Sequence, residues 1–144
     1  MPSLSMLNAS RVSEAIKQFV EAVLQAYGSN VVSIVLFGSR ARGDWTHYSD
    51  ADILVILSQH PKRLIDRLSE FATYSPSGLV EPFVYTKEEI ETMFQSRNAF
   101  LLDILMYGIP LFDQGFWKDL RNRFEALLEK GVIQRFKSGW RIGG

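Results

Sequence analysis

Apolar residues recur at three- and four-residue spacing over the first part of the chain, which is the pattern of an amphipathic helix. The spacing predicts a helix from Ala9 to Tyr27 that ends at Gly28, a residue that tolerates the left-handed conformation common at helix ends. The inward-facing positions are Val12, Ile16, Phe19, Val20, Val23 and Tyr27. One face of this helix is therefore expected to cover the core.

Three shorter stretches have the composition of β-strands. Val31 to Phe37 and Asp52 to Leu57 are rich in branched apolar residues, which is typical of buried strands. Leu79 to Tyr85 is predicted as a third strand, and Pro82 within it cannot donate a ladder hydrogen bond. This third strand is therefore expected at an edge of the sheet or at a bulge.

Further helices are predicted between and after these strands. Pro61 suits the first turn of a helix that runs to about Thr73. The inner face of that helix is expected to carry Leu64, Ile65 and Leu68.

Two helix signals follow the third strand. Thr86 and Glu89 form a capping box, in which each side chain binds a free backbone N–H at the start of a helix. The stretch from Asn98 to Tyr107 is apolar on nearly all sides, so we expect this helix to be deeply packed or to face a partner. The last helix is predicted from Phe116 to Lys130.

The order of these elements indicates an α/β (α+β) fold, with a small mixed sheet of about three strands flanked by helices. At 144 residues the chain is long enough for one domain with its own core. We expect 1–112 to form that domain and 113–144, a helix with a basic tail, to pack on it. The chain has no cysteine, which excludes a disulfide framework and a thiol nucleophile.

The overall charge is balanced, with sixteen basic and sixteen acidic residues, which argues against nucleic acid as a partner. From Lys118 onward, however, seven basic residues accompany only three acidic ones. This tail is either a solvated surface or a surface for a polyphosphate, an RNA or an acidic partner. Trp140 within it is interpreted as a packing residue, with a cover for a base or a partner as the alternative.

No segment of the sequence indicates a membrane or secretory signal. The first ten residues lack a basic region followed by an apolar run, and no apolar run approaches the ~20 residues that span a bilayer. We therefore expect a cytoplasmic location and no membrane association.

The most informative stretch joins the first two strands. Gly38 and Ser39 follow the first strand, ten residues intervene, and Asp50 and Asp52 open the second. Residues two apart in a strand point the same way, about 6.6 Å apart, and two carboxylates at that distance repel by on the order of 2 to 3 kcal/mol. A divalent cation removes this repulsion, and ligation by oxygen alone favours Mg²⁺ or Mn²⁺.

The turn before these aspartates suits a phosphate. Gly38 lets the backbone approach closely, Ser39 adds a hydroxyl and an N–H donor, and Arg40 and Arg42 add positive charge. A phosphate-binding turn beside a pair of metal ligands is what phosphoryl or nucleotidyl transfer requires. A P-loop is excluded, because the residues after Gly43 are not the Lys and Ser or Thr of that motif.

Gly38-Ser39, ten residues and then Asp50-x-Asp52, flanked by strands, resemble the signature of the minimal nucleotidyltransferase (MNT) branch of the DNA polymerase beta superfamily. The resemblance is strongest over 31–57. It implies a polymerase beta palm-like fold in which Gly38 and Ser39, with Arg40 and Arg42 beside them, hold a nucleoside triphosphate. It also implies that Asp50 and Asp52 bind two Mg²⁺ ions, which Mn²⁺ could replace.

The same resemblance concerns a third carboxylate, which the family takes from the next strand of the sheet. Glu81 is the only acid in the third strand, and it would bind metal and accept a proton from the acceptor hydroxyl. The alternative for Glu81 is an exposed acid of an edge strand.

The resemblance also implies an activity and a partner. Small MNT proteins resemble antitoxins that pair with HEPN-type toxins and adenylylate a tyrosine on them. We therefore expect an enzyme that moves a nucleoside monophosphate, AMP from ATP, to an acceptor hydroxyl and releases pyrophosphate. Its partners would be ATP or another NTP, and a HEPN-type protein or a second copy of the chain. The alternatives are a weak or inactive nucleotide-binding module that acts through protein contacts, and an enzyme that modifies an antibiotic or nucleic acid.

Overall fold

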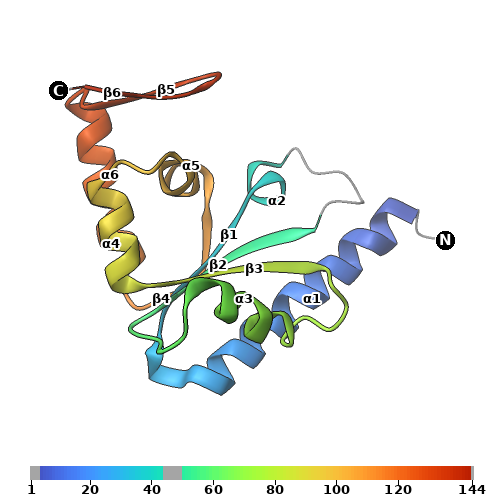
Figure 1. Ribbon diagram of the computed structural model, residues 1–144. Coiled ribbons are helices and arrows are strands. Elements are labelled where there is room, and N and C mark those ends of the chain that lie inside the picture. Colours follow the sequence, from blue (N-terminus) through green and yellow to red (C-terminus); the bar gives the residue numbers. More distant parts are fainter. Residues whose placement is uncertain (1–3, 44–49, 144) are drawn as a thin grey trace.

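The computed structural model describes residues 4–43 and 50–143 of the chain. A four-stranded sheet in the order β3-β2-β1-β4 lies at its centre (Figure 1). Its strands are β1 (Val31–Phe37), β2 (Ala51–Leu57), β3 (Val80–Thr86) and β4 (Ile109–Asp113). The helices are α1 (Leu4–Tyr27), α2 (Ser39–Arg42), α3 (Leu64–Ala72), α4 (Lys87–Gln95), α5 (Ala99–Tyr107) and α6 (Phe116–Glu129). A separate hairpin follows, formed by β5 (Ile133–Phe136) and β6 (Gly139–Ile142).

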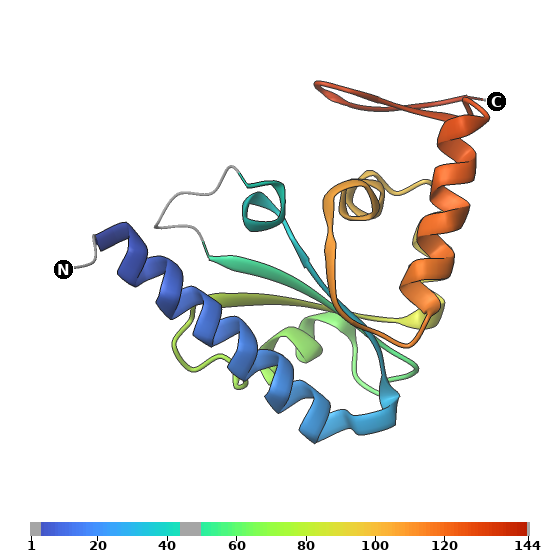
Figure 2. The ribbon, with the colours of Figure 1, turned by 180° about the vertical axis from the view of Figure 1, so that it is seen from behind.

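The sheet separates two layers of helices (Figures 1 and 2). Residues of α1 and α3 build a core on one face, and residues of α4, α5 and α6 build a core on the other. Strand β2 contributes alternately to both, because successive side chains of a strand point to opposite faces. Ile53 and Val55 point toward α1 and α3, whereas Leu54 and Ile56 belong to the α4–α6 core.

The expected fold class is confirmed, since β1 pairs antiparallel with β2 and β4, and β2 pairs parallel with β3. Strand β3 lies at one edge of the sheet, where Pro82 is tolerated. Helix α1 begins at Leu4, earlier than expected, and α3 begins at Leu64, so that Pro61 lies before the helix. Within the described residues, no helix is both long enough and apolar enough to cross a bilayer.

Strand β4 and the hairpin were not expected from the sequence. β4 is a five-residue edge strand whose first three residues are exposed, and its sequence, IPLFD, contains a proline and no alternation of apolar and polar residues. It is held by its pairing with β1 and by Ser33, whose hydroxyl donates to Asp113 Oδ1 at 2.7 Å. Asp113 also accepts backbone N–H groups of Trp117 and Lys118, each at 3.0 Å, and so ties the sheet to the start of α6.

The predicted inner face of α3 is wrong. Leu64, Ile65 and Leu68 are 37%, 68% and 36% exposed, whereas Arg67 and Phe71 are buried. Phe71 stacks on the ring of Tyr27 at 4.9 Å between centroids. Arg67 can be buried because its guanidinium donates to Glu89 Oε1 at 2.5 Å and to the Lys62 carbonyl at 2.8 Å.

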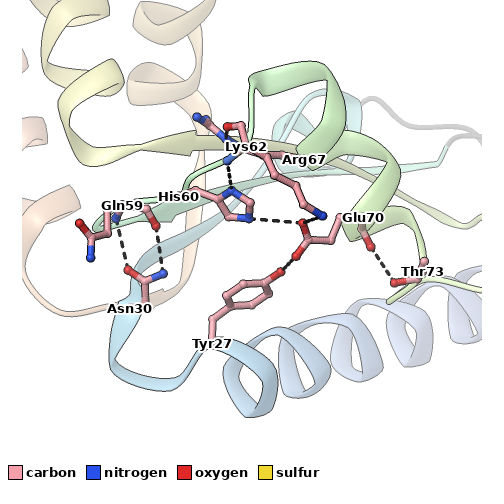
Figure 3. A network of polar contacts seen from close by, with 8 residues as sticks. All are labelled: Tyr27, Asn30, Gln59, His60, Lys62, Arg67, Glu70 and Thr73. Carbon is pink, nitrogen blue, oxygen red and sulfur yellow. Dashed lines mark hydrogen bonds and ion pairs between the residues drawn. The ribbon is translucent and has the colours of Figure 1, made fainter.

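The end of α1 is fastened to α3 by a polar network around Glu70 (Figure 3). The Tyr27 hydroxyl donates to Glu70 Oε1, while Lys62 Nζ lies 3.0 Å and His60 Nε2 3.3 Å from Glu70 Oε2. His60 Nδ1 accepts the backbone N–H of Lys62 at 3.0 Å. The Tyr27 hydrogen bond, together with the nearby Lys62, holds the pKa of Glu70 below its usual value despite partial burial.

We predict that Glu70→Gln lowers the free energy of unfolding by about 1–2 kcal/mol at pH 7. The change removes the negative charge that accepts the Tyr27 hydrogen bond and lies beside Lys62. A lowered pKa means that this charge stabilises the fold above pH 4.5, and that the stabilisation is lost as the pH falls through the folded-state pKa. Urea unfolding should therefore give a difference between the two proteins that shrinks from pH 7 to pH 3.5. Glu21→Gln, an exposed change on α1, is the control. A difference that is constant over this range contradicts the assignment.

Candidate active site

Strand β1 ends in a turn that only glycine fits. Gly38 has φ 75° and ψ −154°, a conformation that L side chains rarely adopt, and it leads directly into α2. The turn is closed by the Arg42 N–H, which donates to the Gly38 carbonyl at 3.1 Å, and by the Gly43 N–H, which donates to the Ser39 carbonyl at 3.0 Å. The backbone of residues 38–43 thus forms a compact single turn at the end of the central strand.

The strand registers bring the acidic residues to this turn. Asp52 lies opposite Phe37 on β1, and Glu81 lies beside Asp52 on β3. Asp50 precedes β2 by one residue and, two positions from Asp52, lies on the same side of the chain. The three carboxylates predicted from the sequence therefore lie together at the end of the sheet where β1 finishes in the Gly38 turn.

Gly38 and Asp52 approach each other closely. A Cβ built on Gly38 would lie within 3.0 Å of Asp52 Oδ2 and at 3.3 Å from its Cγ. The absence of a side chain at position 38 therefore leaves the space that the Asp52 carboxylate occupies. Glycine is required here twice, for the backbone conformation and for this approach.

The electrostatics of the turn centre on Asp52. Partial burial, together with the charge and the hydrogen bond of Glu81 and the charge of Asp50, raises the pKa of Asp52 to about 6, while Arg42 acts in the opposite direction. Asp50 and Glu81 are exposed, and Asp52 is half-buried. The site is thus a crowded acidic cluster with a cation at its border.

The residues expected to hold phosphate lie on the same turn. Ser39 is half-buried at the start of α2, Arg40 follows in the same turn, and the exposed Arg42 is near enough to act on Asp52. Residues 44–49, which connect this turn to Asp50, lie outside the described part of the chain.

The donor set suits a hard cation that is shared with a substrate. Carboxylate oxygens are the preferred ligands of Mg²⁺, which commonly binds one or two of them together with substrate phosphates. A cation would also offset the burial and the neighbouring negative charges that raise the pKa of Asp52. In the described ranges, no three Asp, Glu or His side chains stand close enough to enclose a metal ion by themselves. The remaining ligands would therefore come from phosphate and water.

Helix α5 packs on the face of the sheet to which Asp52 belongs. By strand alternation, Asp52 continues the row of Leu54 and Ile56, which faces α4–α6. Between the strands and α5 lie three phenylalanine rings in contact, with centroids 5.2 to 5.7 Å apart: Phe37, Phe83 and Phe100.

A cavity of about 150 Å³ lies beside Gly38, between α2 and α5, and we call it the α2–α5 cavity. It is lined by Phe37, Gly38, Arg42, Phe100, Asp103, Ile104 and Tyr107. Sequence analysis missed Asp103 and Tyr107, although a signal existed: they are polar positions four residues apart on an otherwise apolar helix. A larger cavity of about 550 Å³ lies at the opposite end of β2 and β3, around Ser58 and Thr86. Its lining does not include Asp50, Asp52 or Glu81.

Comparison with known proteins identifies the family. The model of the nucleotidyltransferase domain matches residues 16–108, which include the Gly38 turn and all three carboxylates. The chain belongs to the nucleotidyltransferase family. The enzyme class expected from the Gly-Ser and Asp-x-Asp pattern is thereby confirmed.

Two relatives of this nucleotidyltransferase come from Methanocaldococcus jannaschii, and both are described as candidate protein adenylyltransferases. One is 29% identical over 94% of this chain and 97% of its own length. The other is 30% identical over 69% of this chain and 98% of its own length.

Solved structures share the fold. A candidate nucleotidyltransferase from Sulfolobus solfataricus aligns over 79% of this chain and 91% of its own, with a TM-score of 0.57 and 23% identity. A toxin–antitoxin structure with AMP-PNP aligns over 78% of this chain and 86% of the matched chain, with a TM-score of 0.52 and 18% identity.

We predict that Gly38→Ala weakens binding of Mg·ATP to the nucleotidyltransferase at least tenfold, because the new Cβ displaces the Asp52 carboxylate. Gly78→Ala is the matched control, since Gly78 has a similar φ of 73° and nothing within 4 Å of a built Cβ. Both variants should lose about 1–2 kcal/mol of stability to backbone strain, but only Gly38→Ala should lose nucleotide affinity in calorimetric titration, by at least tenfold. Equal affinity of the two variants for Mg·ATP would contradict the importance of the close approach between Gly38 and Asp52.

We further predict that Asp52→Asn stabilises the metal-free protein by about 1–3 kcal/mol at pH 7.5, allowing for solvent screening. The raised pKa means that the stability contribution of Asp52 is complete below pH 3.8 and is lost as the pH rises through about 6. The gain should therefore nearly vanish at pH 4 in urea unfolding with EDTA. Asp66→Asn on α3 should change stability by less than about 0.5 kcal/mol. If Asp52→Asn instead lowers stability at pH 7.5, the negative charge of Asp52 is not destabilising in the folded protein, and the assignment is wrong.

Proposed function

We propose that this nucleotidyltransferase transfers AMP from ATP to a hydroxyl group of a partner protein and releases pyrophosphate. The observation that carries the proposal is the approach of the Asp52 and Glu81 carboxylates to the Gly38 turn. This approach supports the proposal because a glycine turn suited to phosphate and an acidic cluster then lie at the same end of the strands. Nucleotidyl transfer needs these two features together, because its catalysis consists of positioning and charge stabilisation.

Each residue of the site has a role in this proposal. The backbone of Gly38 and Ser39, with the Ser39 hydroxyl, binds the triphosphate, and Arg40 and Arg42 neutralise part of its charge. Asp50, Asp52 and Glu81 would hold the metal. Two Mg²⁺ ions, or Mn²⁺ in their place, would supply charge neutralisation at the phosphate oxygens when bound.

The transfer itself is an in-line displacement. The acceptor oxygen forms a bond to the α-phosphorus of ATP, and the bond between that phosphorus and the bridging oxygen to the β-phosphate breaks. Pyrophosphate leaves with the bonding electrons. The hydroxyl proton of the acceptor passes to the Glu81 carboxylate, which is exposed at the edge strand and therefore accessible from outside.

A tyrosine of a HEPN-type toxin is the acceptor that we favour, which would make this protein an antitoxin. The supporting likenesses are the relatives described as candidate protein adenylyltransferases and the shared fold with a toxin–antitoxin structure that contains AMP-PNP. The exposure of Asp50 and Glu81 also favours a macromolecular acceptor, because a second protein can close over them.

A second candidate function is a nucleotide-binding partner module without catalysis. It is favoured by the observation that, within the residues described, no three acidic or histidine side chains enclose a metal site unaided. Such a module would bind Mg·ATP without consuming it, even with its partner present.

We predict that the protein transfers label from α-³²P-ATP to a co-purified HEPN-type protein in the presence of Mg²⁺. Asp52→Asn should reduce the rate at least 100-fold, because charge stabilisation at the phosphate is lost, while the exposed Asp66→Asn on α3 should retain it. A tyrosine-to-phenylalanine change in the partner should remove the labelled site, as read by mass spectrometry. Transfer that survives Asp52→Asn contradicts the proposed role of Asp52 in holding the metal, and nucleotide binding without transfer favours the module.

A further inference from the structure

The α2–α5 cavity adjoins the proposed triphosphate site but is too small for a whole nucleotide. Its volume is about 150 Å³, whereas ligand pockets usually measure about 300 Å³ or more. Gly38 and Arg42 are among its lining residues, so the cavity opens directly on the turn that would bind phosphate. Its other lining residues come mainly from α5, which lies beside α2 in both ribbon views (Figures 1 and 2).

We propose that the α2–α5 cavity binds the purine base of ATP and that Asp103 selects the amino group of adenine. This inference rests on the proposed function, because it assumes that the triphosphate lies on the Gly38 turn. It adds a recognition site for the base, which the Gly-Ser and Asp-x-Asp pattern does not supply.

Tyr107 lines the α2–α5 cavity together with Gly38 of the turn proposed to bind phosphate. Leu36 of β1 lies opposite Ile109 of β4 in an antiparallel pair. Gly38 lies two residues beyond Leu36, and α5 ends at Tyr107, two residues before Ile109; both residues line the α2–α5 cavity. Asp52 flanks the end of β1 from the other side, through its pairing with Phe37. The triphosphate turn thus lies between the acidic cluster and the α2–α5 cavity.

The lining of the cavity suits an aromatic base. Phe100 and Phe37 form its apolar part, and their rings meet edge to face at 5.5 Å between centroids. Tyr107 is 41% exposed although its ring is large and mostly apolar. An exposed aromatic ring beside a phosphate site can stack on a base, and such stacking tolerates any base. Tyr107 therefore contributes affinity without selecting among bases.

Asp103 supplies the selection, because it is held in a fixed orientation. Trp140 Nε1 donates to Asp103 Oδ1 at 2.8 Å, and Arg135 Nε lies 3.3 Å from the same oxygen. Both contacts fall on Oδ1, which leaves Oδ2 as an acceptor for a ligand. A carboxylate oxygen accepts a hydrogen bond from the 6-amino group of adenine and repels a carbonyl oxygen at the same position.

The hairpin has a defined task in this arrangement. Trp140 packs against Phe124 of α6, with ring centroids 5.8 Å apart, and Arg135 lies over the Trp140 ring. The hairpin is thereby anchored on α6 and reaches α5 through Asp103. In this proposal the hairpin positions Asp103 through Trp140 and Arg135.

The contribution of the base is tested by comparing Mg·ATP with magnesium tripolyphosphate, which has the phosphate chain alone. Calorimetric titration of the wild-type protein should give at least tenfold tighter binding of ATP. Tyr107→Ala should weaken ATP at least fivefold and leave tripolyphosphate unchanged. Equal binding of the two ligands by the wild type, or an equal effect of Tyr107→Ala on both, overturns the base site.

The role of Asp103 is tested with inosine triphosphate, in which a carbonyl oxygen replaces the 6-amino group. The wild-type protein should prefer ATP by at least tenfold. Asp103→Asn keeps an oxygen for Trp140 and turns a donor toward the base, so the preference should fall below threefold or reverse. Asp66→Asn should keep the wild-type ratio. An unchanged ratio in Asp103→Asn overturns the assignment.

These experiments separate the base site from the proposed function. If the triphosphate site is elsewhere, Gly38→Ala will leave binding of both ATP and tripolyphosphate unchanged, and the proposed function fails. If only the base site is wrong, Gly38→Ala will weaken both ligands while Tyr107→Ala and Asp103→Asn behave like the wild type.

Discussion

The parallel pairing of β2 with β3 is the constraint on which the site depends. Its register sets Asp52 beside Glu81 at the end of the sheet, and the antiparallel pairing with β1 sets the same Asp52 against the Gly38 turn. Partial burial and the neighbouring like charges disfavour the charged form of Asp52, as its raised pKa indicates. A structure retains such a cluster at a cost, which is typical of sites that bind a cation or a polyphosphate.

Most of the remaining structure holds in place the strands that carry this site. The two cores fix β1 and β2 from both faces, and the Glu70 network and the buried Arg67 fasten α3 at the far end of the strands. Three phenylalanine rings fill the space beneath α5. The arrangement separates stability, which comes from the cores, from chemistry, which lies where the strands end and polar groups are exposed.

The sequence was most informative where local chemistry and structure coincide. Gly38, Asp50 and Asp52 could be predicted because a glycine corner and paired acids have few structural alternatives at that spacing. The face of α3 could not, because Leu64, Ile65 and Leu68 follow a helical period while the buried side is decided by ion pairing of Arg67 across the fold. β4 was missed because tertiary pairing with β1, rather than its own composition, makes it a strand. Asp103 and Tyr107 were not singled out from the sequence, because only the folded chain places them in one cavity with Gly38.

The central claim is that the Gly38 turn and the three carboxylates together form the site for a metal-bound triphosphate. The most direct test is a crystal structure of the protein with Mn²⁺ and a non-hydrolysable ATP analogue, with the metal located by its anomalous scattering. We expect manganese bound to Asp50 and Asp52, and phosphate oxygens on the Gly38 and Ser39 backbone. Manganese away from these aspartates, or a nucleotide in the 550 Å³ cavity at the other end of the sheet, would contradict it.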